Sequence, residues 1–139
     1  MPHDFEAFPE LTNNQMSFYY FDSPHRQITE SFMAKVEEVT DGDTIHVSWS
    51  ERDFTFPVRF ANINAPELNN GGEESKAWLK GEIEGEEVEV LVDNNNRVGK
   101  YGRLLGTIMY AGLDMNQMSE VLGYSKQFGE PSVFGEIKL

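Results

Sequence analysis

A hairpin turn at Asp41-Gly42, between two runs of alternating apolar and polar residues, constrains the fold of this chain more than any other feature. The Asp-Gly pair is a strong signal for a tight turn between two strands. Alternation with period two, over residues 32–40 and 43–49, is typical of half-buried strands. Residues 54–62 alternate in the same way after a second turn, so we predict an antiparallel meander of three strands.

The rest of the domain supplies two more strands and two helices. Alternating runs at residues 86–92 and 103–110 predict the fourth and fifth strands, and residues 73–84 predict a helix after the third strand. Asp114, with Gln117 three residues later, can cap a second helix that ends at Gly123 and has Met115, Met118 and Leu122 as its apolar stripe. This order predicts a mainly β protein with helices: an OB-fold, a five-stranded antiparallel barrel with two to three helices.

Two local signals add detail to this scheme. Pro57 lies within the third run and favours an edge or bulged position, because proline cannot donate to a strand ladder. Residues 1–30 are broken by prolines, and we interpret them as an N-terminal extension that packs on a domain formed by residues 31–139. The aromatic run at residues 18–21 is expected to pack on that domain. A docking patch or a base-stacking platform is the alternative.

The composition limits the cellular context. The chain has 139 residues, enough for one domain with its own core, and it has no cysteine for disulfides or thiolate chemistry. The N-terminus lacks the basic start and apolar core of a signal peptide, so we expect a cytoplasmic protein, with a viral origin or another secretion route left open. We also expect a monomer. No apolar run approaches the length of a membrane helix, and we expect no membrane partner.

The net charge of −13 bears on the identity of the ligand. Proteins that bind nucleic acid usually present a basic surface, because neutralising phosphates drives the affinity. Either a local basic cleft lies within an acidic body, or nucleic acid is not the ligand. An acidic surface can also be an adaptation to a salty medium.

The motif Asp41-Gly42-Asp43-Thr44 is weakly informative when taken alone, since it suits an ordinary turn. It does not begin an EF-hand loop, because the fifth and twelfth positions are Ile45 and Arg52. An aspartyl-phosphate phosphatase would need a buried parallel strand before the motif, and residues 36–40 are too polar for one.

Four short motifs in order make the pattern specific: DGDT at 41–44, VRF at 58–60, INAPE at 63–67 and KYGR at 100–103. Over about residues 33–124 the chain resembles the staphylococcal nuclease family. The resemblance implies an OB-fold barrel with helices. It also implies a calcium-dependent nuclease that hydrolyses phosphodiester bonds of DNA and/or RNA, leaving 3′-phosphate and 5′-hydroxyl ends. The third, C-terminal helix of the family is not evident here.

The resemblance also implies catalytic residues. Arg59 and Arg103 match the pair that holds the phosphate, as two guanidinium groups can do bidentately. Glu67 matches the general base that activates water. Lys100 and Tyr101 match positions that contact the substrate phosphate. The alternatives are ion pairs, with strand carboxylates for Arg59 and with surface acids for Arg103, and an ordinary solvated acid for Glu67. The occurrence of all three within the family motifs favours the functional interpretation.

A calcium site is implied in the same way. Asp43 matches a carboxylate ligand, the main-chain carbonyl of Ala65 matches a second ligand, and Asp41 lies nearby without direct contact. Asn64 occupies a position where the family usually has aspartate. Its side-chain oxygen can still bind calcium, but it brings no charge, so we expect weaker calcium binding.

Two classes of function follow from these features. The first is a phosphodiesterase that cuts nucleic acid, and the retained Glu67, Arg59 and Arg103 favour it. The second is a weakened or inactive nuclease-fold module that binds nucleic acid or a protein partner. For the enzyme, the basic residues Lys35, Arg97, Lys100 and Arg103 are expected to gather near the cleft.

Overall fold

Three strands in hairpin succession begin the barrel, as the alternation predicts. In the computed structural model, which describes residues 3–99 and 102–127, these are β1 (Phe32–Asp41), β2 (Thr44–Ser48) and β3 (Phe56–Phe60). The pairs β1–β2 and β2–β3 are antiparallel. Every second residue of β3 is buried, so the strand presents one face to the core.

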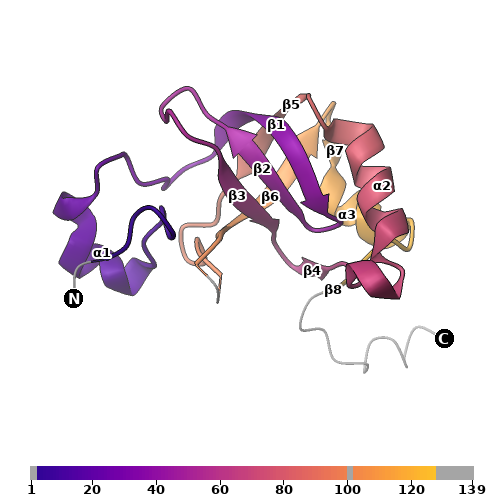
Figure 1. The fold of residues 1–139 in the computed structure, drawn as a ribbon, viewed down its shortest axis with the longest axis horizontal. Helices are drawn as coiled ribbons and strands as arrows, with labels where there is room; N and C mark the ends of the chain where they lie inside the picture. The colour runs from indigo at the N-terminus through magenta and orange to yellow at the C-terminus, as the bar shows by residue number, and fades with distance from the viewer. Residues whose placement is uncertain (1–2, 100–101, 128–139) are drawn as a thin grey trace.

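The barrel closes through a parallel contact. The remaining strands are β5 (Glu87–Leu91), β6 (Leu104–Tyr110) and β7 (Leu113–Asp114), and the sheet order is β3-β2-β1-β5-β6-β7 (Figure 1). An additional pairing of β3 with β6 is parallel, whereas the other strand pairs of this sheet are antiparallel. The OB-fold prediction is therefore confirmed, with one parallel pair where the barrel closes.

The position of Pro57 agrees with this closure. Pairing between β3 and β6 begins at Val58 and Leu104. Among the described strands, Pro57 pairs with β2 alone, opposite His46. The proline therefore lies where β3 is locally an edge, and its missing N–H leaves the β6 ladder intact.

Two helices cover one end of the barrel. They are α2 (Gly72–Ile83), after the short η2 (Leu68–Asn70), and α3 (Met115–Val121). The carboxylate of Asp114 caps α3 by accepting from the backbone N–H of Gln117 at 3.0 Å, which confirms the predicted cap. A small second sheet pairs β4 (Ile63–Asn64) with β8 (Lys126–Gln127). Residues 128–139, where a further helix would follow, lie outside the described residues.

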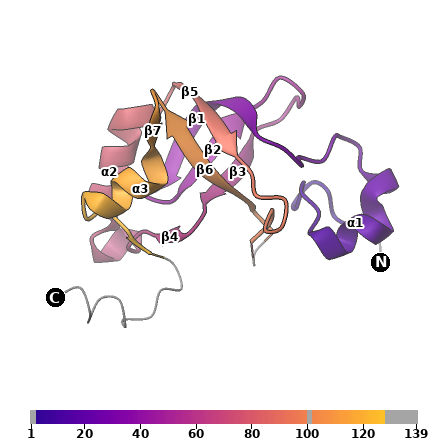
Figure 2. The same cartoon turned by 180° about the vertical axis from the view of Figure 1, so that it is seen from behind.

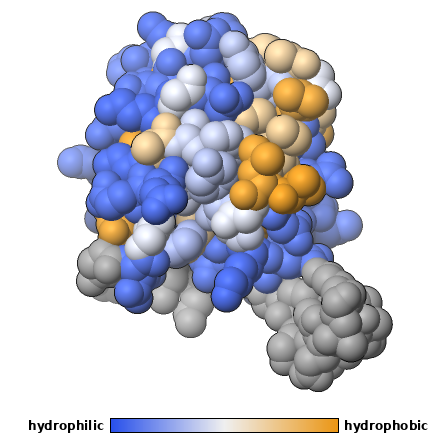
Figure 3. Space-filling view, turned by 90° about the vertical axis from the view of Figure 1, so that its right-hand side faces the viewer, coloured by the Kyte–Doolittle hydropathy of each residue, from blue (hydrophilic) through white to orange (hydrophobic). Residues whose placement is uncertain are grey.

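The core fills the barrel and continues beneath α2. Its buried side chains come from β1, β2, β3, β5 and β6 and from α2 and α3. The largest fully buried ones include Phe56, Phe60, Ile45, Leu79, Leu104 and Met115. Seen from the side that carries α2 and α3, the surface is mostly hydrophilic with one hydrophobic patch (Figure 3). Leu122, expected in the core-facing stripe of α3, is instead half-exposed. No helix among the described residues has both the length and the apolar character needed to cross a membrane.

The N-terminal segment, residues 3–30, lies at the opposite end of the barrel from α2 and α3 (Figures 1 and 2). It contains α1 (Asn13–Tyr19) and the short helix η1 (Tyr20–Asp22). Leu11 and Ile28 are fully buried. The aromatic run does not follow them, because Phe18 is 78% exposed and Phe21 is 96% exposed. The expectation that this run packs on the domain is therefore wrong for these two rings.

Candidate functional site

The turn between β1 and β2 holds two aspartates against a neighbouring loop. The backbone N–H of Asp43 donates to the Asp41 carboxylate at 3.0 Å, and the backbone N–H of Ala65 donates to Asp43 Oδ2 at 2.8 Å. Gly42 makes the approach possible, since a Cβ there would lie 1.9 Å from the Oγ of Ser75 on α2. The glycine of the motif thus brings the turn, α2 and the loop after β4 together.

A hydroxyl group links the aspartate turn to one of the predicted arginines. Thr44 Oγ1 donates to Asp43 Oδ1 at 3.1 Å and accepts from Arg103 Nη1 at 3.2 Å. Thr44 is buried, although it alternates with the polar residues of its strand. We did not assign it a role from the sequence, and its inclusion in the DGDT motif was the available signal.

Arg59 reaches the same aspartate from β3. Its Nη1 donates to the carbonyls of Phe60 at 2.6 Å and Ile63 at 2.8 Å, which fixes the direction of the guanidinium. Its Nη2 donates to Asn64 Oδ1 at 3.1 Å and lies 3.4 Å from Asp43 Oδ2. Arg59 therefore forms this ion pair with a carboxylate of the turn between β1 and β2, and not with a strand carboxylate.

Their contacts with the aspartate turn bring Arg59 and Arg103 close to each other. Burial lowers the pKa of Arg59, and the positive charge of Arg103 lowers it further, while Asp43 opposes both effects. Like charges lower one another's pKa in this way only when they are near. A second anion placed between the guanidinium groups would relieve their repulsion.

Asp43 carries an unusual charge balance. Burial raises its pKa from the ordinary 3.8 to about 6, and the neighbouring Asp41 adds to the rise through a hydrogen bond and its charge. The N–H of Ala65 and the charge of Arg59 work in the opposite direction. Burial thus disfavours the charged form of this carboxylate, and a cation bound beside it would favour that form.

Glu67 differs from these residues in being exposed. It precedes η2, and its main-chain carbonyl accepts from the backbone N–H of Asn70 at 2.8 Å and of Gly72 at 2.9 Å. A Cβ at residue 72 would lie 2.3 Å from the Pro66 carbonyl oxygen, so a glycine is needed to start α2 here. The backbone of Glu67 is thus fixed while its carboxylate faces solvent.

The donor set at this site is made of oxygen atoms. Residues 3–99 and 102–127 contain no group of three or more His, Cys, Asp and Glu side chains that could hold a metal ion. Asp41 and Asp43 supply carboxylates, and Asn64 supplies an amide oxygen that contacts Arg59. Oxygen donors, two of them carboxylates, fit a hard cation such as calcium, with fewer charges than a tight calcium site has.

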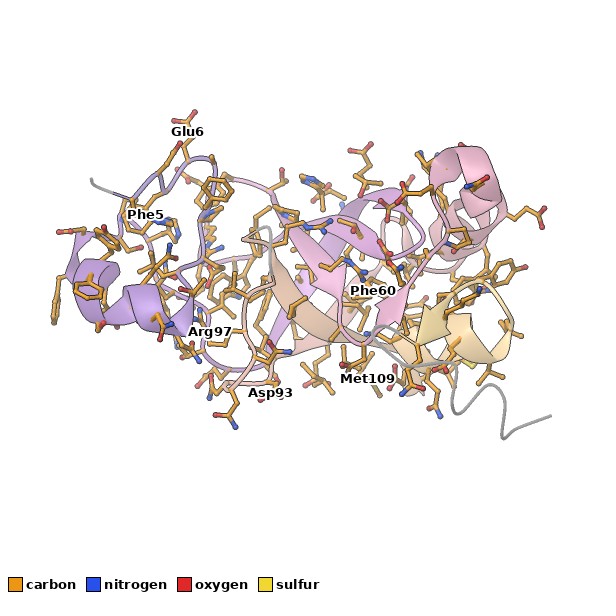
Figure 4. The ribbon with its side chains drawn as sticks, turned by 90° about the horizontal axis from the view of Figure 1, so that it is seen from below. Phe5, Glu6, Phe60, Asp93, Arg97 and Met109 are labelled. Atoms are coloured by element: carbon orange, nitrogen blue, oxygen red, sulfur yellow. The ribbon has the colours of Figure 1, made fainter. Side chains whose placement is uncertain are left out.

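The other basic residues do not all gather here. Lys100 and Tyr101 lie outside the described residues. The expectation for Arg97 is wrong: it is 3% exposed and its guanidinium contacts Glu10, at the junction between the N-terminal segment and the barrel (Figure 4). Lys35 is an exposed residue of β1, paired in register with Ser48.

Comparison with known proteins gives two kinds of match. Residues 57–124 match the family model described as "Staphylococcal nuclease homologue", a region that contains Arg59, Asn64, Glu67 and Arg103 but begins after Asp43. A Bacillus anthracis protein described as uncharacterized is 29% identical over 68% of this chain and 47% of its own length. Endonuclease Htp3 of Saprolegnia parasitica is 32% identical over 73% of this chain and 58% of its own length. The chain thus spans about half the length of these relatives.

Proposed function

The chain belongs to the staphylococcal nuclease family, and we propose that it is a calcium-dependent nuclease that hydrolyses phosphodiester bonds of DNA and/or RNA. The observation that carries the proposal is the convergence of Arg59 and Arg103 on one aspartate, Asp43, directly and through the hydroxyl of Thr44. Guanidinium groups on a rigid barrel suit a phosphate, because they are charged at every working pH and bind its oxygens bidentately.

In the proposed reaction, Arg59 and Arg103 hold the non-bridging oxygens of the scissile phosphate. Their charge stabilises the pentacoordinate transition state, which is more negative at those oxygens than the substrate. Substrate binding replaces part of the ion pair between Arg59 and Asp43 with an ion pair to phosphate. The burial that lowers the pKa of Arg59 strengthens that new ion pair, since the guanidinium is poorly solvated there.

Glu67 is the proposed general base. Its exposed carboxylate can take a proton from a water molecule positioned for attack on phosphorus. The two hydrogen bonds accepted by its carbonyl fix the backbone from which that carboxylate extends. Attack by this water on phosphorus would break the bond to the 5′-oxygen, which would take a proton from solvent, and would leave a 3′-phosphate and a 5′-hydroxyl.

The proposed calcium ligands are the Asp43 carboxylate, the Asn64 amide oxygen and the Ala65 carbonyl, with Asp41 beside them. When bound, calcium would polarise the phosphoryl oxygen and offset developing charge. The aspartates would balance that cation, and Asn64 would exchange its contact with Arg59 for the metal. Because asparagine brings no charge, we propose that calcium is held weakly.

The test is cleavage of single-stranded DNA and RNA by the full chain, with calcium, with magnesium and with a chelator. We expect calcium-dependent cleavage that falls by roughly a hundredfold or more in Glu67→Gln, as the loss of a general base predicts. The matched control is Glu87→Gln, which removes an exposed glutamate from β5. Cleavage that persists in Glu67→Gln would contradict the role of this base, and an inactive wild type would contradict the nuclease.

The exposed aromatic residues of the N-terminal segment favour a second candidate function. Exposed rings such as Phe18 and Phe21 are typical of a binding surface. In this candidate, the barrel is a weakened or inactive module that binds nucleic acid or a protein partner through these rings. The double variant Phe18→Ala with Phe21→Ala separates the two functions: loss of partner binding with no change in cleavage would assign the rings to docking alone.

A further inference from the structure

The hydrogen bonds that the structure describes for the Arg97 guanidinium all go to acceptors in the N-terminal segment. Its Nε donates to the carbonyl of Ile28 at 2.7 Å, and its Nη1 donates to the carbonyl of Leu11 at 2.8 Å. Its Nη2 donates to Glu10 Oε1 at 2.8 Å, and both charged side chains are 2% exposed. A lysine could not reproduce this set, since it has one nitrogen in place of three.

Glu10 is the centre of the same buried cluster. Its Oε1 also accepts from the backbone N–H of Ile28 at 2.9 Å, and its Oε2 pairs with Arg52. The guanidinium of Arg52 lies over the ring of Phe56, 4.5 Å from the ring centroid, on the barrel strand β3. One glutamate thus joins the segment to the barrel and to the loop that carries Arg97. Breaking a buried ion pair of this kind is costly, because the remaining partner stays buried and charged.

The backbone of Arg97 is in turn the base of the loop that leads to Arg103. The carbonyl of Arg97 accepts from the N–H of Leu105 at 2.8 Å, and the N–H of Gly99 donates to the carbonyl of Arg103 at 2.8 Å. The two sides of this loop are therefore bonded to each other immediately beside Arg103. Any shift of Arg97 is passed to the backbone of Arg103 through these two hydrogen bonds.

A second contact reaches the loop from the segment. Gly102 has φ +79°, and a Cβ added there would lie 2.7 Å from Cδ1 of Phe8. The ring of Phe8 therefore packs directly on the backbone next to Arg103. Figures 1 and 2 show the start of the segment beside the loop between β5 and β6 from both sides.

We propose that the N-terminal segment is a positioning element of the phosphate site, in which Glu10 and Arg97 hold the loop that orients the guanidinium of Arg103. This proposal rests on the nuclease function proposed above. A displacement of about 1 Å at a group that contacts the transition state can cost about a hundredfold in rate. The segment therefore contributes to turnover without touching the substrate.

The experiment uses the full chain with Arg97→Lys and Glu10→Gln, each made alone and in an Arg103→Lys background. The matched control is Arg26→Ala, which removes an arginine of the same segment whose side chain pairs at the surface with Glu51. Two quantities are measured: kcat and KM for single-stranded DNA with calcium, and amide hydrogen exchange at Gly99 and Leu105.

We expect Arg97→Lys and Glu10→Gln to lower kcat by roughly tenfold or more with Arg103 present, and by less than about twofold in the Arg103→Lys background. Exchange at Gly99 and Leu105 should become faster in both variants and stay unchanged in Arg26→Ala. Equal losses of kcat in the two backgrounds would overturn the proposal, because a general loss of stability acts on both alike.

The exchange measurement keeps the two proposals separate. If the wild type cuts no nucleic acid, the nuclease function fails, yet the exchange rates at Gly99 and Leu105 still report whether Glu10 and Arg97 hold the loop. If those rates are unchanged in both variants, the positioning role is wrong whether or not the protein cleaves DNA.

Discussion

Asp43 Oδ2 accepts a hydrogen bond from the backbone N–H of Ala65 at 2.8 Å. This single contact joins the turn after β1 to the loop that carries Glu67, two residues beyond Ala65. The metal-binding part of the proposed site and its proposed base therefore share one mechanical link, and substitutions that disturb the turn should affect both.

The first prediction concerns Gly42. A methyl group there would lie 1.9 Å from Ser75 Oγ and 2.9 Å from the Cβ of Ala65, so we expect Gly42→Ala to lower the free energy of unfolding by about 2 kcal/mol. Cleavage should also fall, because the turn must move away from Ala65. Denaturant unfolding and kcat measure the two effects.

Two companion variants make this prediction specific. Gly81→Ala meets no atom within 4 Å and should raise the free energy of unfolding by up to about 1 kcal/mol, as alanine favours a helix. Ser75→Ala should cost little or stabilise, because the buried Ser75 hydroxyl has no hydrogen-bond partner among the described residues. If Gly42→Ala proves as stable as Gly81→Ala, the packing described for the turn is incorrect.

The second prediction concerns Thr44. Valine keeps the branched shape that suits β2 but removes the hydroxyl between Asp43 and Arg103. We expect Thr44→Val to lower kcat by roughly tenfold and the free energy of unfolding by about 1 kcal/mol. Thr55→Val is the control, since Thr55 is exposed. Equal kcat values for the two variants would remove Thr44 from the site.

The third prediction follows from the raised pKa of Asp43, from 3.8 to about 6, caused first by burial. The folded protein holds this proton more tightly than the unfolded chain, so the contribution to stability is complete below pH 3.8 and is lost as the pH rises through about 6. Measured in the presence of chelator, Asp43→Asn should therefore remove this loss from the free energy of unfolding between pH 3.8 and about 6. The same slope in Asp43→Asn as in Asp53→Asn, which alters an exposed aspartate, would rule this out.

The fourth prediction concerns the asparagine at the proposed metal site. Asn64→Asp adds a carboxylate beside Arg59 and Asp43, and we expect calcium to bind roughly tenfold more tightly, measured by calorimetry. In calcium, the tighter binding should also raise the melting temperature. Asn14→Asp, which makes the same change in α1, should leave the calcium affinity unchanged. Unchanged affinity in Asn64→Asp would exclude residue 64 as a ligand.

The barrel could be predicted from the sequence because the signals for its strands and helices are local. Each of the five predicted barrel strands is indicated by alternation of apolar and polar residues over a few positions. The cap of α3 likewise needs only Asp114 and Gln117. The N-terminal segment holds the same kind of local signal. Thr12 and Gln15 form a capping box at the start of α1.

The features that the sequence did not predict depend on contacts between residues far apart in the chain. The positive charge of Arg97 suggested a place near the phosphate-binding cleft. Its partner Glu10 lies 87 residues earlier in the chain, and no spacing rule connects the two. The two-residue strand β8 has no period to detect, and only its pairing with Ile63 and Asn64 defines it. The exposure of Phe18 and Phe21 likewise depends on how α1 and η1 are oriented, which a run of aromatic residues does not specify.

The parallel pairing of β3 with β6 places Arg59 opposite Leu105, two positions beyond Arg103. A chain interrupted between β5 and β6 would divide the arginine pair between two fragments. The fragment with β1 to β5 would carry both aspartates and the glutamate, and the other fragment would carry the second arginine. Under the proposed function, cleavage of DNA would arise only where the two fragments reassemble, so this closure would suit a split reporter.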